Sequence, residues 1–357
     1  MKIILSGGGT LGPVAPLLAI YEIYKQHDRS ANFFWVGTRH GPEKELVETY
    51  NIPYFSVTSG KLRRYYSLWN LVDIFKIFFG FFQSIVLLIK YQPDLVISAG
   101  GFVSVPLHYA AALLGIPAWI HQQDAQAGLA NRLMAPVASQ ITCALADSQN
   151  QFKRRKIQWI GNPVRDLSVP DLSVSRQYFD LPNDAKVILA FGGGTGSEHL
   201  NSLIIEALPH LPSYAHIIHL TGRDRPDNLA QGAVNTFKNY HPYKFLTSKM
   251  KDAYAVADLI IGRGGFVTIT ESASLAKPTI LIPMNNTHQE KNVLELSDKK
   301  AVIMMDEKKV NGLNIAHAVK KLLDRPDLAQ YLGEHLREVL PPARADKVVE
   351  IVEKLIK

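Results

Sequence analysis

Two glycine-rich turns, each directly after an apolar run, are the features of this sequence best suited to chemistry. "GGGTLG" at Gly7–Gly12 follows the run Lys2–Leu5, and "GGGTGS" at Gly192–Ser197 follows Lys186–Phe191. A strand, a glycine turn and a helix start direct backbone N–H groups and the helix dipole at one point. The first turn is therefore predicted to bind an anion such as a phosphate, and the second turn repeats its pattern.

A second pair of turns repeats in the same way. "SAGGF" at Ser98–Phe102 is echoed by "GRGGF" at Gly262–Phe266. In the later turn the glycines let the backbone approach a ligand closely, and the helix start supplies N–H groups for a diphosphate. Glu271, in the second turn of this helix, either accepts both hydroxyls of a ribose or is an ordinary glutamate that faces solvent. The polar loop Met284–Asn292 follows the next strand, at the edge where open α/β sheets bind ligands.

A dinucleotide site is an alternative for the first turn, because the pattern G-x-G-x-x-G fits Gly7, Gly9 and Gly12. This pattern is common by chance, the acidic residue that would hold a ribose is not evident, and the second turn stays unexplained. His216 and His219 lie three apart on an expected strand, so they face opposite sides and are expected to be structural. The sequence has no P-loop, H-E-x-x-H or Cys/His metal spacing, and we expect neither a metal nor a cofactor.

Apolar β-prone runs alternate with helical stretches along the whole chain, which indicates parallel α/β sheets. The expected strands are 2–5, 33–36, 95–98, 119–121, 186–191, 217–220, 259–261, 279–282 and 302–305. The paired turns lie about half a chain apart, so we expect two Rossmann-like, doubly wound domains that face a central cleft. The expected domains are 1–163 and 164–341, and a helix in 342–357 packs back on the N-terminal domain or caps the other half.

The composition is that of a globular enzyme, with 357 residues, 47% of them hydrophobic and 20% charged. The net charge of +7 suits phosphorylated ligands or an anionic membrane surface. No nucleic acid is expected as a partner, because no recognition motif occurs. The single cysteine, Cys143, rules out a disulfide framework and suits a reducing cytoplasm. We expect no signal peptide, because the first apolar run is too short.

A long apolar segment over residues 62–90 stands beside basic residues. Its basic and aromatic members include Arg63, Arg64, Trp69, Phe75, Phe78 and Phe82. The uncharged run 77–89 is shorter than the roughly 20 residues needed to span a bilayer. A helix with this apolar face is expected to lie in the interface of an anionic membrane. The alternative is a buried core helix.

At these residues the sequence resembles the inverting GT-B glycosyltransferases of family 28, the MurG-like family. The similarity covers essentially the whole chain in order. It begins with "SGGGT", "WVGT" with Glu43 following, "SAGGFVSVP", "GIPAWIHQQD" and "GLANRL". It continues with "GNPVR", "FGGGTGS", "ADLIIGRGG" with "TITE", and "THQEKN". Each motif alone is modest evidence, but their common order is strong evidence.

The resemblance implies a metal-independent, inverting hexosyltransferase that moves N-acetylglucosamine (GlcNAc) from UDP-GlcNAc to the 4-hydroxyl of the muramyl sugar of lipid I. The product would be lipid II, which implies roles in peptidoglycan synthesis, cell-wall biogenesis, cell shape and cell division. The segment over residues 62–90 matches the family's membrane-docking region, so the resemblance also implies a peripheral location on the cytoplasmic face of the cell membrane. The alternatives are a relative that acts on another lipid, a catalytically impaired member of the family, and a nicotinamide oxidoreductase.

The same resemblance implies site residues. Those facing the acceptor diphosphate would be Thr10, Leu11, Gly12, Gly100 and Gly101. Those binding UDP-GlcNAc would be Asp124, Arg165, Gly194, Thr195, Thr247, Phe266, Val267, Thr268, Glu271 and Gln289. Among them, Glu271 would bind the ribose hydroxyls, Gln289 would bind the sugar hydroxyls, and the backbone at Thr247 would contact uracil.

Two loops depart from the family pattern. The first reads "GGTLGP" where relatives read G-G-T-G-G-H, so Pro13 replaces a histidine that serves as base or orients the acceptor. The family's H-E-Q-N becomes "HQQD", with Gln122 and Asp124. Proline cannot accept a proton, whereas a carboxylate gained nearby can. We therefore hypothesise that Asp124 is the base, the alternative being an aspartate that only caps its loop.

Overall fold

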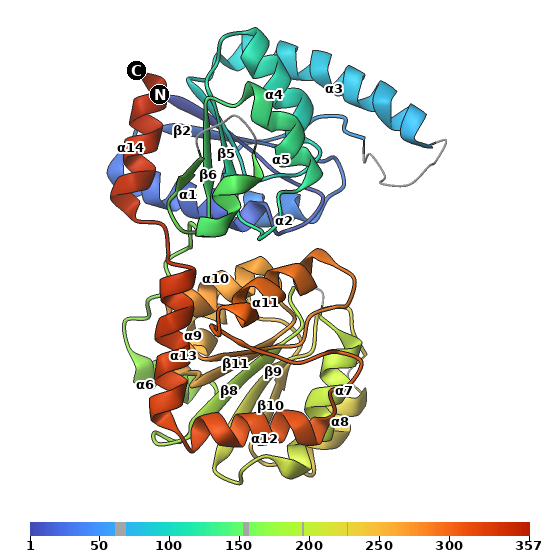
Figure 1. Ribbon diagram of the computed structural model, residues 1–357, viewed down its shortest axis with the longest axis vertical. Coiled ribbons are helices and arrows are strands. Elements are labelled where there is room, and N and C mark those ends of the chain that lie inside the picture. Colours follow the sequence, from blue (N-terminus) through green and yellow to red (C-terminus); the bar gives the residue numbers. More distant parts are fainter. Residues whose placement is uncertain (61–68, 153–156, 195, 227) are drawn as a thin grey trace. The chain divides into compact units, whose positions relative to one another are not determined.

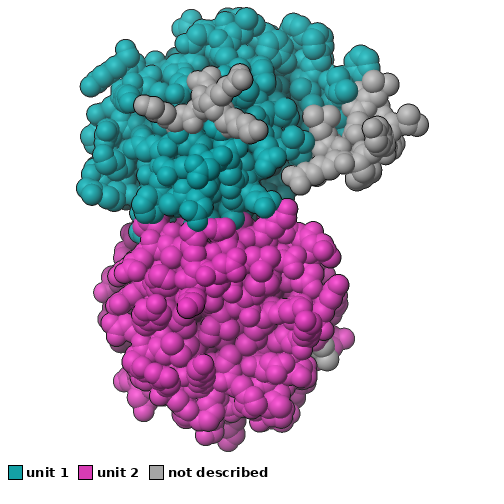
Figure 2. All heavy atoms as spheres, viewed as in Figure 1, with its two compact units in different colours: residues 1–165, 342–357 teal, residues 166–341 magenta. Residues whose placement is uncertain are grey.

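The computed structural model describes residues 1–60, 69–152, 157–194, 196–226 and 228–357. They form two compact units, residues 1–165 with 342–357 and residues 166–341, coloured separately in Figure 2. Each unit contains one sheet whose strands all pair in parallel, with helices around it (Figure 1). The predicted class, two doubly wound α/β domains, is therefore confirmed.

The first unit has a seven-stranded sheet in the order β3-β2-β1-β4-β5-β6-β7. Its strands are β1 (Lys2–Ser6), β2 (Asn32–Gly37), β3 (Tyr54–Ser56), β4 (Leu95–Ser98), β5 (Ala118–Gln122), β6 (Gln140–Cys143) and β7 (Ile157–Trp159). Its helices are α1 (Val14–His27), α2 (Glu43–Glu48), α3 (Trp69–Tyr91), α4 (Ser104–Leu113), α5 (Leu129–Met134) and α14 (Ala345–Ile356), with short 3-10 turns at Ala135–Val137 and Ala146–Gln151. Alternate residues of β1 pack into cores on opposite faces, Ile3 and Leu5 with α1 and α14, Ile4 with α3 and α4.

The end of the chain belongs to the first unit. Val348, Ile351 and Val352 of α14 are buried in the same cluster as α1. His27 Nε2 lies 3.1 Å from a Glu353 carboxylate oxygen at the surface of this contact. Helix α14 therefore completes one face of the sheet, although it follows the second unit in sequence (Figure 1).

The second unit has a six-stranded sheet in the order β10-β9-β8-β11-β12-β13. Its strands are β8 (Lys186–Phe191), β9 (Ala215–Leu220), β10 (Tyr240–Tyr243), β11 (Leu259–Gly262), β12 (Thr279–Leu281) and β13 (Ile303–Met304). Its helices are α6 (Leu172–Tyr178), α7 (Glu198–Ala207), α8 (Asn228–Val234), α9 (Met250–Val256), α10 (Phe266–Ser274), α11 (His288–Asp298), α12 (Gly312–Leu323) and α13 (Pro326–Val339), with a 3-10 turn at Leu208–His210.

All nine expected strands are present, and the sequence analysis missed β3, β6, β7 and β10. Three of the missed strands lie at sheet edges, where pairing on one side requires less apolar sequence, and β6 is only four residues long. His216 and His219 face opposite sides of β9, as expected. His219 is buried between Tyr240 and Asn201, whereas His216 stacks on His241.

Helix α3 has one packed face and one exposed face. Asp73, Ser84 and Leu88 are buried, and only 17% of the segment Asp73–Tyr91 is buried overall. Phe75, Phe78 and Phe82 are 68%, 63% and 49% exposed. The alternative of a buried core helix is therefore wrong. Arg63, Arg64 and the side chain of Trp69 lie outside the described part of the chain.

By length and composition, Asp73–Tyr91 is also apolar enough to cross a membrane, with a mean hydropathy of 1.7. Its packed face nevertheless belongs to the core of the first unit, where Leu88 and the partly buried Phe81 and Ile85 contact the sheet cluster. Figure 1 shows α3 extending beyond α4 on one flank of this unit. Such a half-packed apolar helix suits an interface better than a span.

Candidate functional site

The first glycine turn, between β1 and α1, is fixed from several sides. Trp35 Nε1 donates to the Gly7 carbonyl at 3.0 Å, and the Gly7 N–H donates to the Val36 carbonyl at 3.3 Å. Gly9 has φ +82°, a conformation that favours glycine, and its N–H donates to the Glu43 carboxylate at 3.1 Å. The turn therefore has one defined shape.

The start of α1 does not supply the free N–H groups that the sequence analysis expected. The Val14 and Ala15 N–H groups both bond the Leu11 carbonyl, at 3.2 and 3.4 Å, and the residues on either side of this pair are prolines without N–H groups. In the described part of the chain, the amides of Thr10, Leu11 and Gly12 have no protein partner. The amides that this turn could offer to an anion are therefore those of the loop and not those of the helix start.

The loop between β4 and α4 lies against this turn. Gly100 and Gly101 have φ values of +116° and +93°. A Cβ atom on Gly101 would stand 3.0 Å from both the backbone nitrogen and oxygen of Gly8, so only glycine allows the two loops to approach this closely. The structure thus brings together Thr10–Gly12 and Gly100–Gly101, the residues predicted to face the acceptor.

Two buried hydrogen-bond acceptors beside these glycines have no partner. Gln123 Oε1 and Asn131 Oδ1 belong to side chains that are each 4% exposed. A Cβ on Gly12 would lie 3.5 Å from Gln123 Nε2, and one on Gly100 would lie 3.6 Å from Asn131 Oδ1. Because an unpaired buried acceptor is costly, such atoms are typical of a site that a ligand donor completes. Sequence reasoning assigned neither residue a role, although both lie in the quoted motifs "HQQD" and "GLANRL".

Asp124 is half-buried in the loop between β5 and α5. Gln122 braces this loop, since its Nε2 donates to the backbone oxygens of Asp124 and Gln126 at 2.7 and 3.2 Å. Asn131 Nδ2 donates to Gln122 Oε1 at 2.7 Å. Asp124 directly follows Gln123, whose side chain lies beside Gly12 of the glycine turn. Its role as base stays a prediction.

Two buried histidines of the first unit do not replace the histidine lost at position 13. His108 bonds Ser98 at 3.2 Å, and His121 bonds Asn162 and Thr142 at 2.7 and 2.8 Å. Burial lowers the pKa of each to about 4. Both rings are therefore neutral near pH 7 and engaged in the protein's own hydrogen bonds.

In the second unit, the start of α10 presents unpaired amides. Gly265 caps the helix, and its carbonyl accepts from Ile269 N–H at 3.2 Å. Within the described residues, the N–H groups of Phe266, Val267 and Thr268 have no protein partner. Such amides and the helix dipole suit an anion, and they lie at the position that the sequence analysis predicted for a diphosphate.

Arg263, just before this helix start, was missed by the sequence analysis. Its side chain is 5% exposed, its Nη2 lies 2.5 Å from Glu307 Oε1, and its Nη1 is buried without a partner. Burial would raise the pKa of Glu307, but hydrogen bonds from Arg263 and the Asn285 amide lower it, so Glu307 stays ionised. Arg263 is thus a buried guanidinium, three residues before Phe266, that is paired with Glu307 on one side and keeps one donor nitrogen without a partner. The sequence analysis assigned a role only to the glycines of "GRGGF", because the burial of the arginine depends on the tertiary structure.

Gln289 and Glu271 both belong to this region. A Cβ on Gly264 would lie 2.5 Å from a Val293 methyl and 3.4 Å from the Gln289 carbonyl, so α11 packs against the turn before α10. Gln289 Oε1 is buried without a hydrogen-bond partner. Glu271 is 6% exposed, so the alternative of a solvent-facing glutamate is wrong.

The second glycine turn, between β8 and α7, contains Gly194. Its neighbours Gly193 and Gly196 have φ values of +86° and +73°. Ser197 caps α7 by accepting the Leu200 N–H at 3.3 Å. Thr195 lies outside the described residues.

Thr247 and Arg165 are placed away from these turns in sequence, and their roles stay predictions. Thr247 is exposed in the loop after β10, where its carbonyl accepts the Met250 N–H at 3.3 Å. Arg165 is the last residue of the first unit before the chain enters the second.

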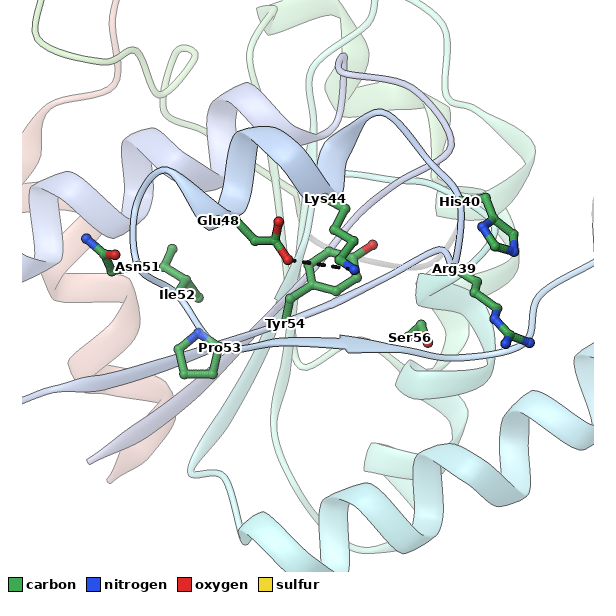
Figure 3. Close-up of a pocket in the computed structure, with 9 residues that line it drawn as sticks. All are labelled: Arg39, His40, Lys44, Glu48, Asn51, Ile52, Pro53, Tyr54 and Ser56. Atoms are coloured by element: carbon green, nitrogen blue, oxygen red, sulfur yellow. Dashed lines mark ion pairs between the residues drawn. The ribbon is translucent and has the colours of Figure 1, made fainter.

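An open pocket of about 730 Å³ lies beside β3 and α2 of the first unit (Figure 3). In this view the Lys44–Glu48 ion pair, 3.7 Å long, lies next to the Tyr54 ring. The lining residues are Arg39, His40, Lys44, Glu48, Asn51, Ile52, Pro53, Tyr54 and Ser56. None of them is a predicted site residue, and the unpaired amides and acceptors described above lie outside this pocket.

Comparison with known proteins gives matches over both units. Residues 3–143 match the N-terminal domain of glycosyltransferase family 28, and residues 187–334 match its C-terminal domain. The UDP-N-acetylglucosamine--N-acetylmuramyl-(pentapeptide) pyrophosphoryl-undecaprenol N-acetylglucosamine transferase of Lachnospira eligens is 34% identical over 336 residues, 93% of each chain. The enzyme of the same name from Staphylococcus carnosus is 33% identical and covers 98% of this chain and 97% of its own.

Solved structures agree with these matches. The crystal structure of Acinetobacter baumannii MurG has a TM-score of 0.75 and 25% identity, and the alignment covers 99% of each chain. A UDP-GlcNAc 2-epimerase from Neisseria meningitidis, 17% identical, has a TM-score of 0.69 and shares the fold.

Proposed function

The chain belongs to glycosyltransferase family 28, and from this premise we propose that it transfers GlcNAc from UDP-GlcNAc to lipid I. Lipid I is the muramyl-pentapeptide acceptor carried on undecaprenyl diphosphate, and its 4-hydroxyl receives the sugar to give lipid II. The protein is thus a hexosyltransferase of peptidoglycan synthesis.

The observation that carries this proposal is the donor region of the second unit. Three unpaired amides at the start of α10, with the buried Arg263, suit the diphosphate of UDP-GlcNAc. The buried, unpartnered Gln289 Oε1 suits a hydroxyl donor of the sugar. Glu271, on the same helix, would accept the ribose hydroxyls.

The first unit would bind the acceptor. The unpaired amides of Thr10, Leu11 and Gly12 suit the acceptor diphosphate, with Gly100 and Gly101 against them. The unpaired oxygens of Gln123 and Asn131 suit hydroxyl or amide N–H donors of the acceptor sugar. This pair gives the acceptor site a preference for a ligand with hydrogen-bond donors rather than a bare lipid.

The reaction is a displacement with inversion. The acceptor 4-hydroxyl oxygen bonds the anomeric carbon of GlcNAc, the bond from that carbon to the UDP oxygen breaks, and the hydroxyl proton goes to a base. Amides and Arg263 would stabilise the charge that develops on departing UDP. We assign the base to Asp124, and a positioned base contributes roughly 10²–10⁴-fold in rate.

We also place the protein on the cytoplasmic face of the membrane, bound peripherally through α3. The exposed phenylalanines of this helix lie on one flank of the acceptor unit, beside Lys76 and Lys90. Apolar burial in the lipid interface and attraction of cations to anionic headgroups would act together there. Such docking would bring the acceptor unit to the surface in which a polyprenyl carrier is embedded.

A transfer assay tests the proposed function. Purified protein with labelled UDP-GlcNAc is expected to label a lipid I analogue, and to leave diacylglycerol and a bare polyprenyl phosphate unlabelled. Labelling of either simple lipid instead would establish the related transferase. UDP-GlcNAc protection against thermal unfolding without any transfer would establish an impaired member, and NADH binding without UDP binding would establish the oxidoreductase.

Replacement of the proposed base is the second test. Asp124→Asn is expected to lower kcat by roughly 10²–10⁴-fold, because the isosteric amide cannot take the proton. Pro13→His in the same chain is expected to restore part of this loss. Asp28→Asn, at a partly exposed carboxylate of the same unit that bonds Ser30, serves as the control. An unchanged kcat in Asp124→Asn contradicts the assignment.

Vesicle sedimentation tests the role of α3. The triple variant Phe75→Ser, Phe78→Ser, Phe82→Ser is expected to bind anionic vesicles at least about tenfold more weakly, because each phenylalanine loses its apolar burial. The control triple variant replaces exposed apolar residues of α6, namely Leu172, Val174 and Tyr178, with serine. Equal vesicle binding by both variants would show that α3 is not the docking surface.

A further inference from the structure

Glu43 is a fully buried carboxylate at the first residue of α2, with 0% of its side chain exposed. Among the described residues, no lysine, arginine or histidine forms an ion pair with it. Its oxygens accept from the Thr38 N–H at 2.7 Å, the Thr38 hydroxyl at 2.5 Å and the Gly9 N–H at 3.1 Å. The Tyr54 hydroxyl donates to the Thr38 carbonyl at 2.6 Å and also lies 3.2 Å from Glu43 Oε1. Burying a carboxylate without a cation is expensive, so these donors are what hold it there.

The backbone around Glu43 leaves room only for this carboxylate. A Cβ atom on Gly8 or on Gly41 would overlap its oxygens. Both chain segments therefore approach the carboxylate through glycines, which have no side chain. Tyr54, whose hydroxyl contacts Glu43, also lines the pocket in Figure 3. Burial and the Glu43 charge raise the pKa of Tyr54 far above its usual value, so its hydroxyl remains a donor.

Glu43 therefore connects the loop after β2 to the glycine turn after β1. On the β1 side, Gly7 is already held by Trp35 and Val36, which leaves Gly9 as the next point where the turn is held. Immediately after Gly9 come the three amides that have no protein partner. The bond from Gly9 to Glu43 thus stands at the junction between the anchored and the unpaired parts of the turn.

We propose that Glu43 is a positioning residue for the acceptor: by holding Gly9, it fixes the turn in the conformation that leaves the amides of Thr10–Gly12 available to the acceptor diphosphate. This inference rests on the proposed function. Glu43 does not touch the acceptor. It acts through the backbone of the turn, and its loss affects acceptor binding without affecting the donor region.

The test is Glu43→Gln, which keeps the shape of the side chain. The glutamine side chain has one oxygen, whereas the donors around Glu43 bond two carboxylate oxygens. In place of the second oxygen stands an NH₂ group, which cannot accept a hydrogen bond from the N–H group that faces it. We expect kcat/KM for a lipid I analogue to fall by about 10- to 100-fold, as for loss of one hydrogen bond to a charged group. The KM for UDP-GlcNAc is expected to stay within about twofold of wild type, because Glu43 contacts none of the described residues expected to bind it, and the start of α10, Arg263 and Gln289 lie in the other unit. Glu48→Gln, an isosteric change at an exposed position of the same helix, is the control.

Tyr54→Phe is a milder second variant, since it keeps the ring and removes only the hydroxyl, which bonds the Thr38 carbonyl and contacts Glu43. It is expected to lower kcat/KM for the acceptor analogue by about three- to tenfold, again with the UDP-GlcNAc KM unchanged. If Glu43→Gln does not fold, the kinetics of Tyr54→Phe test the proposal instead.

Three results would overturn the inference while the wild-type protein still transfers GlcNAc. One is unchanged acceptor kinetics in both variants. Another is a parallel rise in both KM values, which would indicate a purely structural role. A lower acceptor KM in Glu43→Gln would show instead that the carboxylate only repels the diphosphate. If the wild-type protein itself does not transfer GlcNAc to the analogue, the proposed function fails first, and this comparison separates the two failures.

Discussion

The account of this structure depends on backbone amides at the carboxyl ends of parallel strands. A helix or a turn that begins there leaves N–H groups without protein partners. In the first unit these are the amides of Thr10–Gly12, and in the second those of Phe266–Thr268. A buried or half-buried N–H group needs an acceptor, and a phosphate supplies several at once. Each unit builds this feature from the same order of strand, glycine turn and helix, on two separate sheets.

The two units present their unpaired amides in different ways. The second uses a helix N-terminus in the usual way and adds a buried arginine. The first cannot use its helix start, because prolines and the Leu11 carbonyl remove the donors there. It relies on loop amides whose conformation is held by Trp35 and Glu43. This difference makes the first glycine turn more dependent on residues remote from it in sequence.

Periodicity and turn chemistry were sufficient to predict the two sheets and the nine strands with strong apolar runs, because those features are local. The edge strands β3, β7 and β10 were not predicted, because a strand that pairs on one side only needs less apolar sequence. The donors of α1 were predicted wrongly because the pairing of Val14 and Ala15 depends on how the turn folds back. Arg263, Gln123 and Asn131 became visible only in the structure, because an unpaired atom is defined by its surroundings and not by its residue type.

Phosphate binding is the part of the chemistry on which the whole account depends. The most direct measurement is calorimetric titration of the purified protein with UDP and, separately, with uridine. Because a diphosphate would engage two or more charge-assisted hydrogen bonds, the account predicts that UDP binds at least about 100-fold more tightly than uridine. Equal affinities for the two ligands, or no binding of UDP, would contradict it.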